Sequence, residues 1–399
     1  MNVIVIGSGA GGATVARELA KSGINVTIFE KGPLNKMEKS YQNYEVLNTG
    51  IEISQTVCVG GTTTVTMGNA IRTCEKYFKS IGINLKKEFQ EIEDELCVKP
   101  LPDSHFGDGT RKLMNAAESL GFEIKKIPKF IKPQNCKPCG KCAFGCSKDA
   151  KWTTVEFIEE AEKYGAKLID NTPVTEIIVE NDEIKGVKSY DQVFNADIVV
   201  LSAGAIETPR LLQKTGLNAG NNLFVDTFVT VGGILKNIKF NKEVQMNAFI
   251  KIDDIVIAPH YSSLIVEKLH KFGARKKDIL GLMVKIADEP SGNVRENVIK
   301  YSTMKDIGLL AKGSAIAGAI LTESGVDPVT LTSTYARGAH PGGTAAIGDV
   351  VDIDLETKVK GLYVVDASVF PKAPGAPPVL TILALAKRLG KHIIKEKIS

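Results

Sequence analysis

Four cysteines of this chain lie within eleven residues, and their thiols are spaced to bind a metal. They are Cys136, Cys139, Cys142 and Cys146, in the order C-x2-C-x2-C-x3-C. This spacing is typical of bacterial iron–sulfur proteins, in which thiolates hold a [4Fe–4S] cluster. The pattern therefore predicts a [4Fe–4S] cluster that relays single electrons.

Other interpretations of the cysteines remain open. Four thiolates also bind structural zinc, although zinc sites usually use two separated C-x2-C pairs. The loop can also be a vestige that binds no metal. Disulfides are disfavoured in a reducing compartment. The identity of the fourth iron ligand is open as well, because Ser147 rather than proline follows Cys146. Cys58, Cys74 or Cys97 could bind the iron in place of Cys146.

The first thirty residues have the pattern of a βαβ unit that binds a dinucleotide. We expect a strand over residues 2–6, a helix over 13–21 and a strand over 24–29. Gly7 permits the tight turn, Gly9 lets the backbone approach a pyrophosphate, and Gly12 allows the helix to pack on the strand. Glu30 ends the second strand, where an acid accepts hydrogen bonds from ribose hydroxyls. This motif alone does not distinguish FAD from NAD.

Later segments favour FAD. Strand-like pieces at 167–170, 174–179 and 184–188 surround a turn, and a buried strand at 197–202 leads into Ala203. A β-meander followed by such a strand resembles the second half of flavoproteins with two dinucleotide folds.

Five motifs then make the chain resemble the glucose–methanol–choline (GMC) oxidoreductases. They are Gly60–Thr64, Gly68–Arg72, Gly204–Leu217, Gly338–Thr344 and Gly361–Pro371. The resemblance implies an α/β fold: an FAD-binding, two-dinucleotide-fold (Rossmann-like βαβ) domain assembled from discontinuous segments, with a smaller α+β substrate domain. The chain is similar to a short form of the family that carries a ferredoxin-like cysteine cluster.

The resemblance also implies which residues bind FAD. Besides the N-terminal motif, these are Gly61, Thr62, Asn69, Val174, Ala203, Asp366, Ala367, Pro378 and Thr381. A final helix over about 381–395 is expected to point its N-terminus at the isoalloxazine ring, where its dipole favours the anionic reduced flavin.

His340 matches the family's catalytic histidine, which takes the hydroxyl proton while hydride leaves for flavin N5. The family usually has a second His or Asn at the position of Pro377, and proline has no side-chain donor or acceptor. The other histidines, at 105, 260, 270 and 392, are expected to be ordinary surface or core residues.

These observations together predict an FAD-dependent oxidoreductase acting on a CH–OH group, with an alcohol or carbonyl compound as substrate. Electrons would pass through the [4Fe–4S] cluster to a ferredoxin-like acceptor. One alternative is an O2-using alcohol oxidase with incidental cysteines, and the other is a non-catalytic flavin-binding electron-transfer subunit.

We expect the FAD-binding domain to comprise residues 1–75, 151–222 and 334–399, with an insertion at 76–150 that carries the cysteines and a substrate domain at 223–333. Within the substrate domain we expect strands near 228–235, 245–252 and 254–259 and helices over 264–273 and 304–323. The net charge of +4 is too small to indicate a nucleic-acid partner. No apolar run reaches the ~18–20 residues of a membrane helix. No signal peptide is recognised, so a cytoplasmic location is expected.

Overall fold

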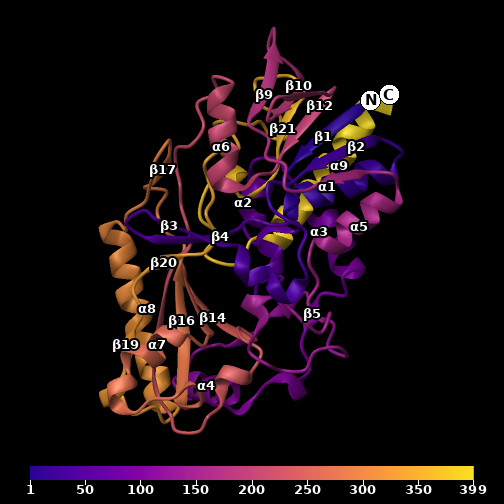
Figure 1. Ribbon diagram of the computed structural model, residues 1–399. Helices are drawn as coiled ribbons and strands as arrows, with labels where there is room; N and C mark the ends of the chain where they lie inside the picture. Colours follow the sequence, from indigo (N-terminus) through magenta and orange to yellow (C-terminus); the bar gives the residue numbers. More distant parts are fainter. Residues whose placement is uncertain (399) are drawn as a thin grey trace.

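The computed structural model describes the backbone of residues 1–398 and the side chains of residues 1–396. Two halves lie one above the other (Figure 1), with both chain ends in the upper half. The upper half contains a parallel sheet and most of the helices from both ends of the chain. The lower half is built around a larger sheet.

The upper half centres on a five-stranded sheet in which every pairing is parallel. Its order is β21 (Leu362–Val364), β12 (Ile198–Leu201), β1 (Asn2–Ile6), β2 (Asn25–Phe29) and β8 (Lys167–Ile169). All four residues of β12 are buried, as expected for a strand covered on both faces. Because the strands come from distant parts of the sequence, the predicted assembly from discontinuous segments is confirmed.

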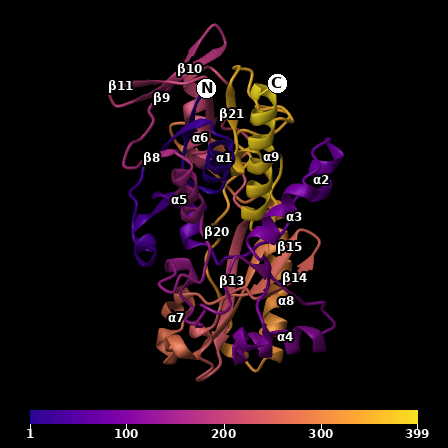
Figure 2. The same cartoon turned by 90° about the vertical axis from the view of Figure 1, so that its right-hand side faces the viewer.

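Helices from both ends of the chain cover this sheet. Figure 2 shows α1 (Ala10–Lys21) beside α9 (Val379–Ile398), and α5 (Val155–Lys163) also packs on α1. The final helix thus begins two residues before the expected start. Arg17 of α1 is fully buried, with its guanidinium carbon 3.5 Å from the centre of the Phe157 ring.

The predicted meander is present as a small antiparallel sheet of β9 (Glu176–Glu180), β10 (Glu183–Ser189) and β11 (Gln192–Asn195). It rises above the rest of the upper half (Figure 1). After β12 the chain enters α6 (Gly204–Lys214).

The lower half is a mixed, nine-stranded sheet. Its order is β3 (Tyr44–Asn48), β4 (Glu52–Thr56), β20 (Arg337–Gly338), β13 (Thr227–Ile234), β16 (Ile279–Ile286), β15 (Ile255–Pro259), β14 (Ala248–Ile252) and β6 (Lys125–Lys126), with β19 (Thr332–Ser333) beside β13. The long helix α8 (Met304–Glu323) packs on β13, β15 and β16. Since β3 and β4 lie early in the chain, the N-terminal segment contributes to both halves.

The sequence patterns predicted three of the nine strands of this sheet and missed the others, including the long strand β16. The strands expected near 228–235, 245–252 and 254–259 are present, whereas β16 was not expected, because its run ILGLMVKI lacks alternation. The helix expected over 264–273 is shorter, since α7 (Ser263–Lys268) is followed by a separate 3₁₀ turn (His270–Phe272). The remaining regular elements are α2 (Glu75–Ser80), α3 (Lys86–Glu95), α4 (Asp108–Ser119), β5 (Lys99–Pro100), β7 (Pro128–Lys129), β17 (Asn293–Val294) and β18 (Val298–Ile299).

None of the helices that the structure describes is both long and apolar enough to cross a membrane.

A buried ion pair supports the start of β13. Lys300 Nζ lies 2.8 Å from Asp288 Oδ2, and both side chains are completely inaccessible to solvent. The Asp288 carboxylate also accepts hydrogen bonds from the amides of Val225 and Thr227.

We predict that Lys300→Met lowers the free energy of unfolding by about 3–5 kcal/mol, because it leaves a buried carboxylate without its counter-charge. Lys305→Met is the matched control, since its 3.9 Å pair with Asp254 is exposed and should contribute about 1 kcal/mol or less. Urea unfolding of both variants checks this, and equal losses of stability would contradict it.

Candidate active site

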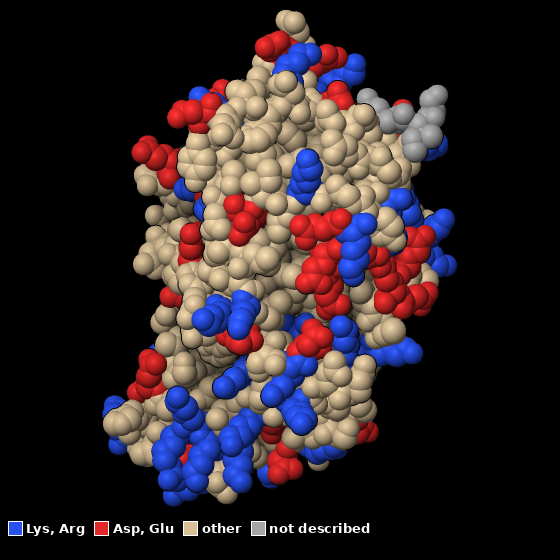
Figure 3. Space-filling view, turned by 45° about the vertical axis from the view of Figure 1, so that its right-hand side comes forward, with Lys and Arg blue, Asp and Glu red and all other residues tan. Residues whose placement is uncertain are grey.

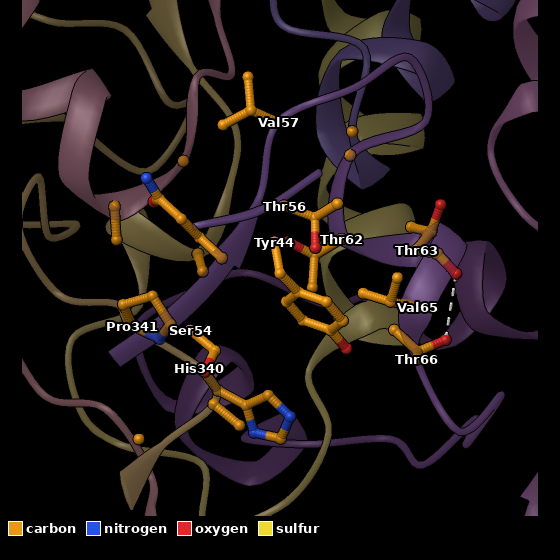
Figure 4. A pocket seen from close by; sticks show the side chains of 18 of the residues that line it. Tyr44, Ser54, Thr56, Val57, Thr62, Thr63, Val65, Thr66, His340 and Pro341 are labelled. Carbon is orange, nitrogen blue, oxygen red and sulfur yellow. Dashed lines mark hydrogen bonds between the residues drawn. The ribbon is translucent and has the colours of Figure 1, made fainter. Parts of the chain in front are cut away.

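A cavity of about 1550 Å³ lies where the two halves meet, and residues of both halves line it. Figure 4 looks into this cavity, with His340 and Pro341 on one chain segment and Tyr44, Thr62, Thr63, Val65 and Thr66 on others. Twelve of the fourteen predicted cofactor and catalytic residues line it: Gly7, Gly9, Glu30, Gly61, Thr62, Asn69, Val174, Ala203, His340, Asp366, Ala367 and Pro378. The fold therefore brings together residues that are far apart in the sequence.

The N-terminal glycines form one end of the cavity. Gly7 has a φ of +94°, and a Cβ on Gly12 would lie 1.9 Å from the Gly7 carbonyl oxygen. Gly12 thus allows helix packing, as expected, rather than lining the cavity. A Cβ on Gly9 would meet no atom within 4 Å, and one on Gly61 would approach the Gly9 Cα at 3.1 Å. The open face at Gly9 leaves backbone at the start of α1 exposed to the cavity, as anion binding requires.

Glu30 is fixed at the end of β2 by three donors. Its Oε2 accepts from the Ser8 amide at 3.0 Å and the Ser8 hydroxyl at 2.7 Å, and its Oε1 accepts from the Gly32 amide at 2.8 Å. Burial raises the pKa of Glu30, and these hydrogen bonds oppose the rise. An ionised carboxylate has about four acceptor sites, so one remains for a ligand hydroxyl.

Asp366 follows β21, the strand that pairs with β12, much as Glu30 follows β2. Its carboxylate accepts from the Gly204 amide, the Thr208 hydroxyl and the Ser368 amide, at 2.9, 2.6 and 2.7 Å. These contacts join the start of α6 to the segment after β21.

Thr381 lies behind the cavity wall rather than in it. Its side chain is fully buried, and its hydroxyl accepts from the Thr73 amide at 2.9 Å. This differs from the expectation that Thr381 contacts the cofactor. Pro377 and Pro378, which immediately precede α9, do line the cavity.

His340 faces the cavity and is held by a carboxylate that the sequence did not indicate. His340 Nδ1 lies 2.8 Å from Asp226 Oδ2, and its side chain is 20% exposed whereas Asp226 is fully buried. Lys285 Nζ lies 3.5 Å from the same Nδ1 and donates to the main-chain oxygen of Asp226 at 3.2 Å. Within residues 1–398, no hydrogen bond uses His340 Nε2.

Burial sets the charge states in this group. It lowers the pKa of His340 well below the usual value, an effect that Lys285 strengthens and Asp288 opposes. Burial raises the pKa of Asp226, opposed by Lys285 and the Gly375 amide. His340 is therefore a neutral imidazole near pH 7, the form that accepts a proton.

Sequence reasoning missed Asp226 and the cavity-lining Lys285, and it assigned His260 an ordinary role. His260 is buried, its Nδ1 lies 3.0 Å from the Thr230 hydroxyl, and it lines the cavity. Burial, together with Arg337 and Lys285, lowers the pKa of His260 to about 3. Asp226 and Lys285 did carry a signal: Asp226 interrupts the apolar run that leads into β13, and Lys285 is a charged residue inside the apolar strand β16.

The cysteine loop borders the cavity but forms no metal site in this structure. Cys139 lines the cavity, whereas Cys136, Cys142 and Cys146 pack on an apolar cluster. Burial, with the neighbouring thiols, raises the pKa of Cys136 to about 12. Among the described residues, no three His, Cys, Asp or Glu side chains are arranged to hold a metal ion. The predicted cluster is thus not shown.

Positive charge surrounds part of the cavity entrance. In Figure 3, Lys and Arg side chains gather over the lower half. Lys141, Lys242 and Lys276 are exposed and line the cavity, and no ion pair involves them in the part of the chain that the structure describes. This charge favours the approach of anionic molecules.

Two profiles of one family match this chain, both described as GMC oxidoreductase, over residues 1–239 and 286–386. The chain belongs to the GMC oxidoreductase family. Members of this family are FAD-dependent oxidoreductases, and this chain is accordingly an enzyme of that class.

Relatives in the family cover nearly the whole chain. An uncharacterized protein of Methanocaldococcus jannaschii is 36% identical, over 98% of this chain and 99% of its own length. A long-chain-alcohol oxidase of Arabidopsis thaliana is 22% identical, over 99% of this chain and 68% of its own length. The crystal structure of pyridoxine 4-oxidase from Mesorbium loti has the same fold, with a TM-score of 0.72 at 14% identity and 98% coverage of each chain.

The cavity fits the FAD that is typical of the family. Gly9 and Gly61 leave a cradle that side chains would fill, and Glu30 keeps a free acceptor site. The buried hydroxyl oxygens of Thr56 and Tyr261, both from lining residues, have no partner among the described residues. A bound group with polar edges would satisfy them.

We predict that Glu30→Ala purifies with less FAD, because it removes charge-assisted hydrogen bonds worth about 1.5–3 kcal/mol, or about 10- to 150-fold in affinity. The control Glu176→Ala changes an exposed residue of β9 outside the cavity. Flavin released by acid from each protein measures this. Recovery of NAD without flavin would contradict the prediction, and so would equal flavin content in the unaltered protein, Glu30→Ala and Glu176→Ala.

Proposed function

We propose that the protein oxidises an alcohol to an aldehyde or ketone, or catalyses the reverse reduction, with FAD bound in the cavity. The observation that carries this proposal is the state of His340: Nδ1 is engaged by a buried carboxylate, while Nε2 has no hydrogen-bond partner among the described residues and the ring faces the cavity. The names of relatives support it, since they include long-chain-alcohol oxidases and a pyridoxine 4-oxidase.

Different residues along the cavity would bind the cofactor, accept the substrate proton and contact the apolar part of the substrate. Gly9, Gly61, Glu30 and Asp366 would hold the cofactor, which, when bound, supplies the acceptor for the hydride. His340 Nε2 takes the proton of the substrate hydroxyl, because the neutral ring offers a lone pair there. Phe228, Met246 and Met283 also line the cavity and supply apolar surface near the lower half.

We predict that His340→Ala keeps its FAD and slows flavin reduction by alcohol about 10²–10⁴-fold, which is the usual contribution of a general base. Anaerobic stopped-flow absorbance measures the rate. The control His270→Ala alters an exposed histidine outside the cavity and should behave as the unaltered protein. Unchanged flavin reduction in His340→Ala would remove His340 from the mechanism.

We further propose that the cysteine loop carries a [4Fe–4S] cluster and passes electrons to a ferredoxin-like acceptor. The spacing supports this, as does the loop's attachment to a cavity wall. Lys151 Nζ donates to the carbonyl oxygens of Cys142, Thr64 and Thr66, at 2.9, 2.8 and 2.8 Å. The thiols would have to rearrange around the metal. An O2-using alcohol oxidase with incidental cysteines is the alternative, whereas the non-catalytic flavin subunit expected as a second alternative does not agree with the family's enzymatic character.

Anaerobically produced protein is predicted to contain about four iron and four sulfide per chain. Cys139→Ser should lose the iron and retain FAD, because the two sites use different segments. Its flavin should still be reduced by substrate but should pass electrons poorly to a one-electron acceptor. Stoichiometric zinc, or no metal at all, would refute the cluster and leave the proposed flavin site intact.

A further inference from the structure

One carboxylate links the two segments in which the family places its catalytic residues. Asp226 Oδ2 contacts His340 Nδ1 at 2.8 Å, and Asp226 Oδ1 accepts from the Gly375 amide at 2.9 Å. Gly375 lies two residues before Pro377, where a polar residue is expected and none is present. The side chain of Asp226 thus lies between His340 and the segment that lacks this residue.

The sheet places these groups together. Asp226 immediately precedes β13, Lys285 lies on β16 opposite Phe228, and β20 leads directly to His340 after pairing with Thr227 and Phe228. Asp288 binds the amides on both sides of Asp226, whose φ of +50° is left-handed. Asp226 and Lys285 are both buried, where an uncompensated charge is costly, so each needs the polar contacts that this group of residues supplies.

The contacts determine which ring nitrogen of His340 carries the proton. Nδ1 can make one hydrogen bond, as a donor or as an acceptor, and it has two neighbours: Asp226 at 2.8 Å and Lys285 at 3.5 Å. An ammonium group cannot accept, so the shorter contact, to a carboxylate, is the one in which Nδ1–H donates. Nε2 therefore keeps its lone pair toward the cavity.

We propose that Asp226 and Lys285 act with His340 as one buried proton-accepting unit, replacing the polar residue that Pro377 cannot supply. Asp226 orients the ring and stabilises the imidazolium after Nε2 takes the substrate proton. Lys285 keeps Asp226 ionised in its buried site. Both are positioning residues, and their catalytic importance rests on the proposed alcohol oxidation.

The proposal predicts opposite pH shifts for the two variants. Asp226→Asn removes a negative charge, so it lowers the pKa of His340 and moves the acid limb of flavin reduction to lower pH. Lys285→Met removes a positive charge, so it raises the pKa of both His340 and Asp226 and moves that limb to higher pH. The other charged or titratable groups that interact with this unit are Lys251, Asp288, Cys74 and His260, and Arg337 acts in turn on His260.

The experiment measures anaerobic flavin reduction against pH in the FAD-loaded protein and its variants. Asp226→Asn should lower the rate about 10³–10⁴-fold, as expected when a catalytic imidazole loses its orienting carboxylate. Lys285→Arg should restore the pH profile that Lys285→Met displaces. Lys312→Met, an exposed lysine on α8, is the control. Unchanged rates, or lower rates without opposite shifts, would overturn the proposal.

A second readout needs no substrate. Nitrogen-15 NMR of labelled histidines should show His340 protonated at Nδ1, with its pKa shifted down in Asp226→Asn and up in Lys285→Met. Protonation at Nε2 would overturn the proposal. If the NMR result is as expected but no alcohol reduces the flavin, the unit exists and the proposed function fails, so the two failures can be told apart.

Discussion

The site depends on the hydrogen bond between Asp226 and His340. Because the Asp226 carboxylate is buried, several neighbouring groups must compensate its charge. Lys285 lies beside it, the Gly375 amide donates to its other oxygen, and Asp288 fixes the backbone on both sides. Asp288 is in turn neutralised by buried Lys300. The centre of the lower sheet therefore has polar requirements that apolar packing alone would not create.

The upper half has a different constraint: backbone segments approach one another closely around the glycines. A Cβ on Gly7, Gly11 or Gly12 would lie within 2.3 Å of a backbone oxygen, whereas a Cβ on Gly9 would meet open space, so main-chain groups form this part of the cavity wall. Glu30 and Asp366 then end two parallel strands with carboxylates whose positions are fixed by amides and hydroxyls. The backbone-lined end with Gly9 and Glu30 and the end that carries His340 thus face one cavity.

The sequence was most informative where local rules dominate. The Gly-rich turn, the buried parallel strands and the last helix follow from residue types within a few positions, and the family motifs located His340. The centre of the lower sheet was harder: β16 has no alternation, and Asp226 and Lys285 meet His340 only through pairings across β13. The cysteine spacing predicted a cluster that the described arrangement does not form. Thr381 matched a motif yet bonds to Thr73, 308 positions away.

The most direct measurement of the central claim is a crystal structure of the FAD-loaded protein with an unreactive alcohol analogue. The account predicts FAD along Gly9 and Gly61, and the analogue's hydroxyl about 2.6–3.2 Å from His340 Nε2, with Nδ1 still bonded to Asp226. A hydroxyl bound away from His340, or a His340 ring turned so that Nε2 faces Asp226, would contradict it.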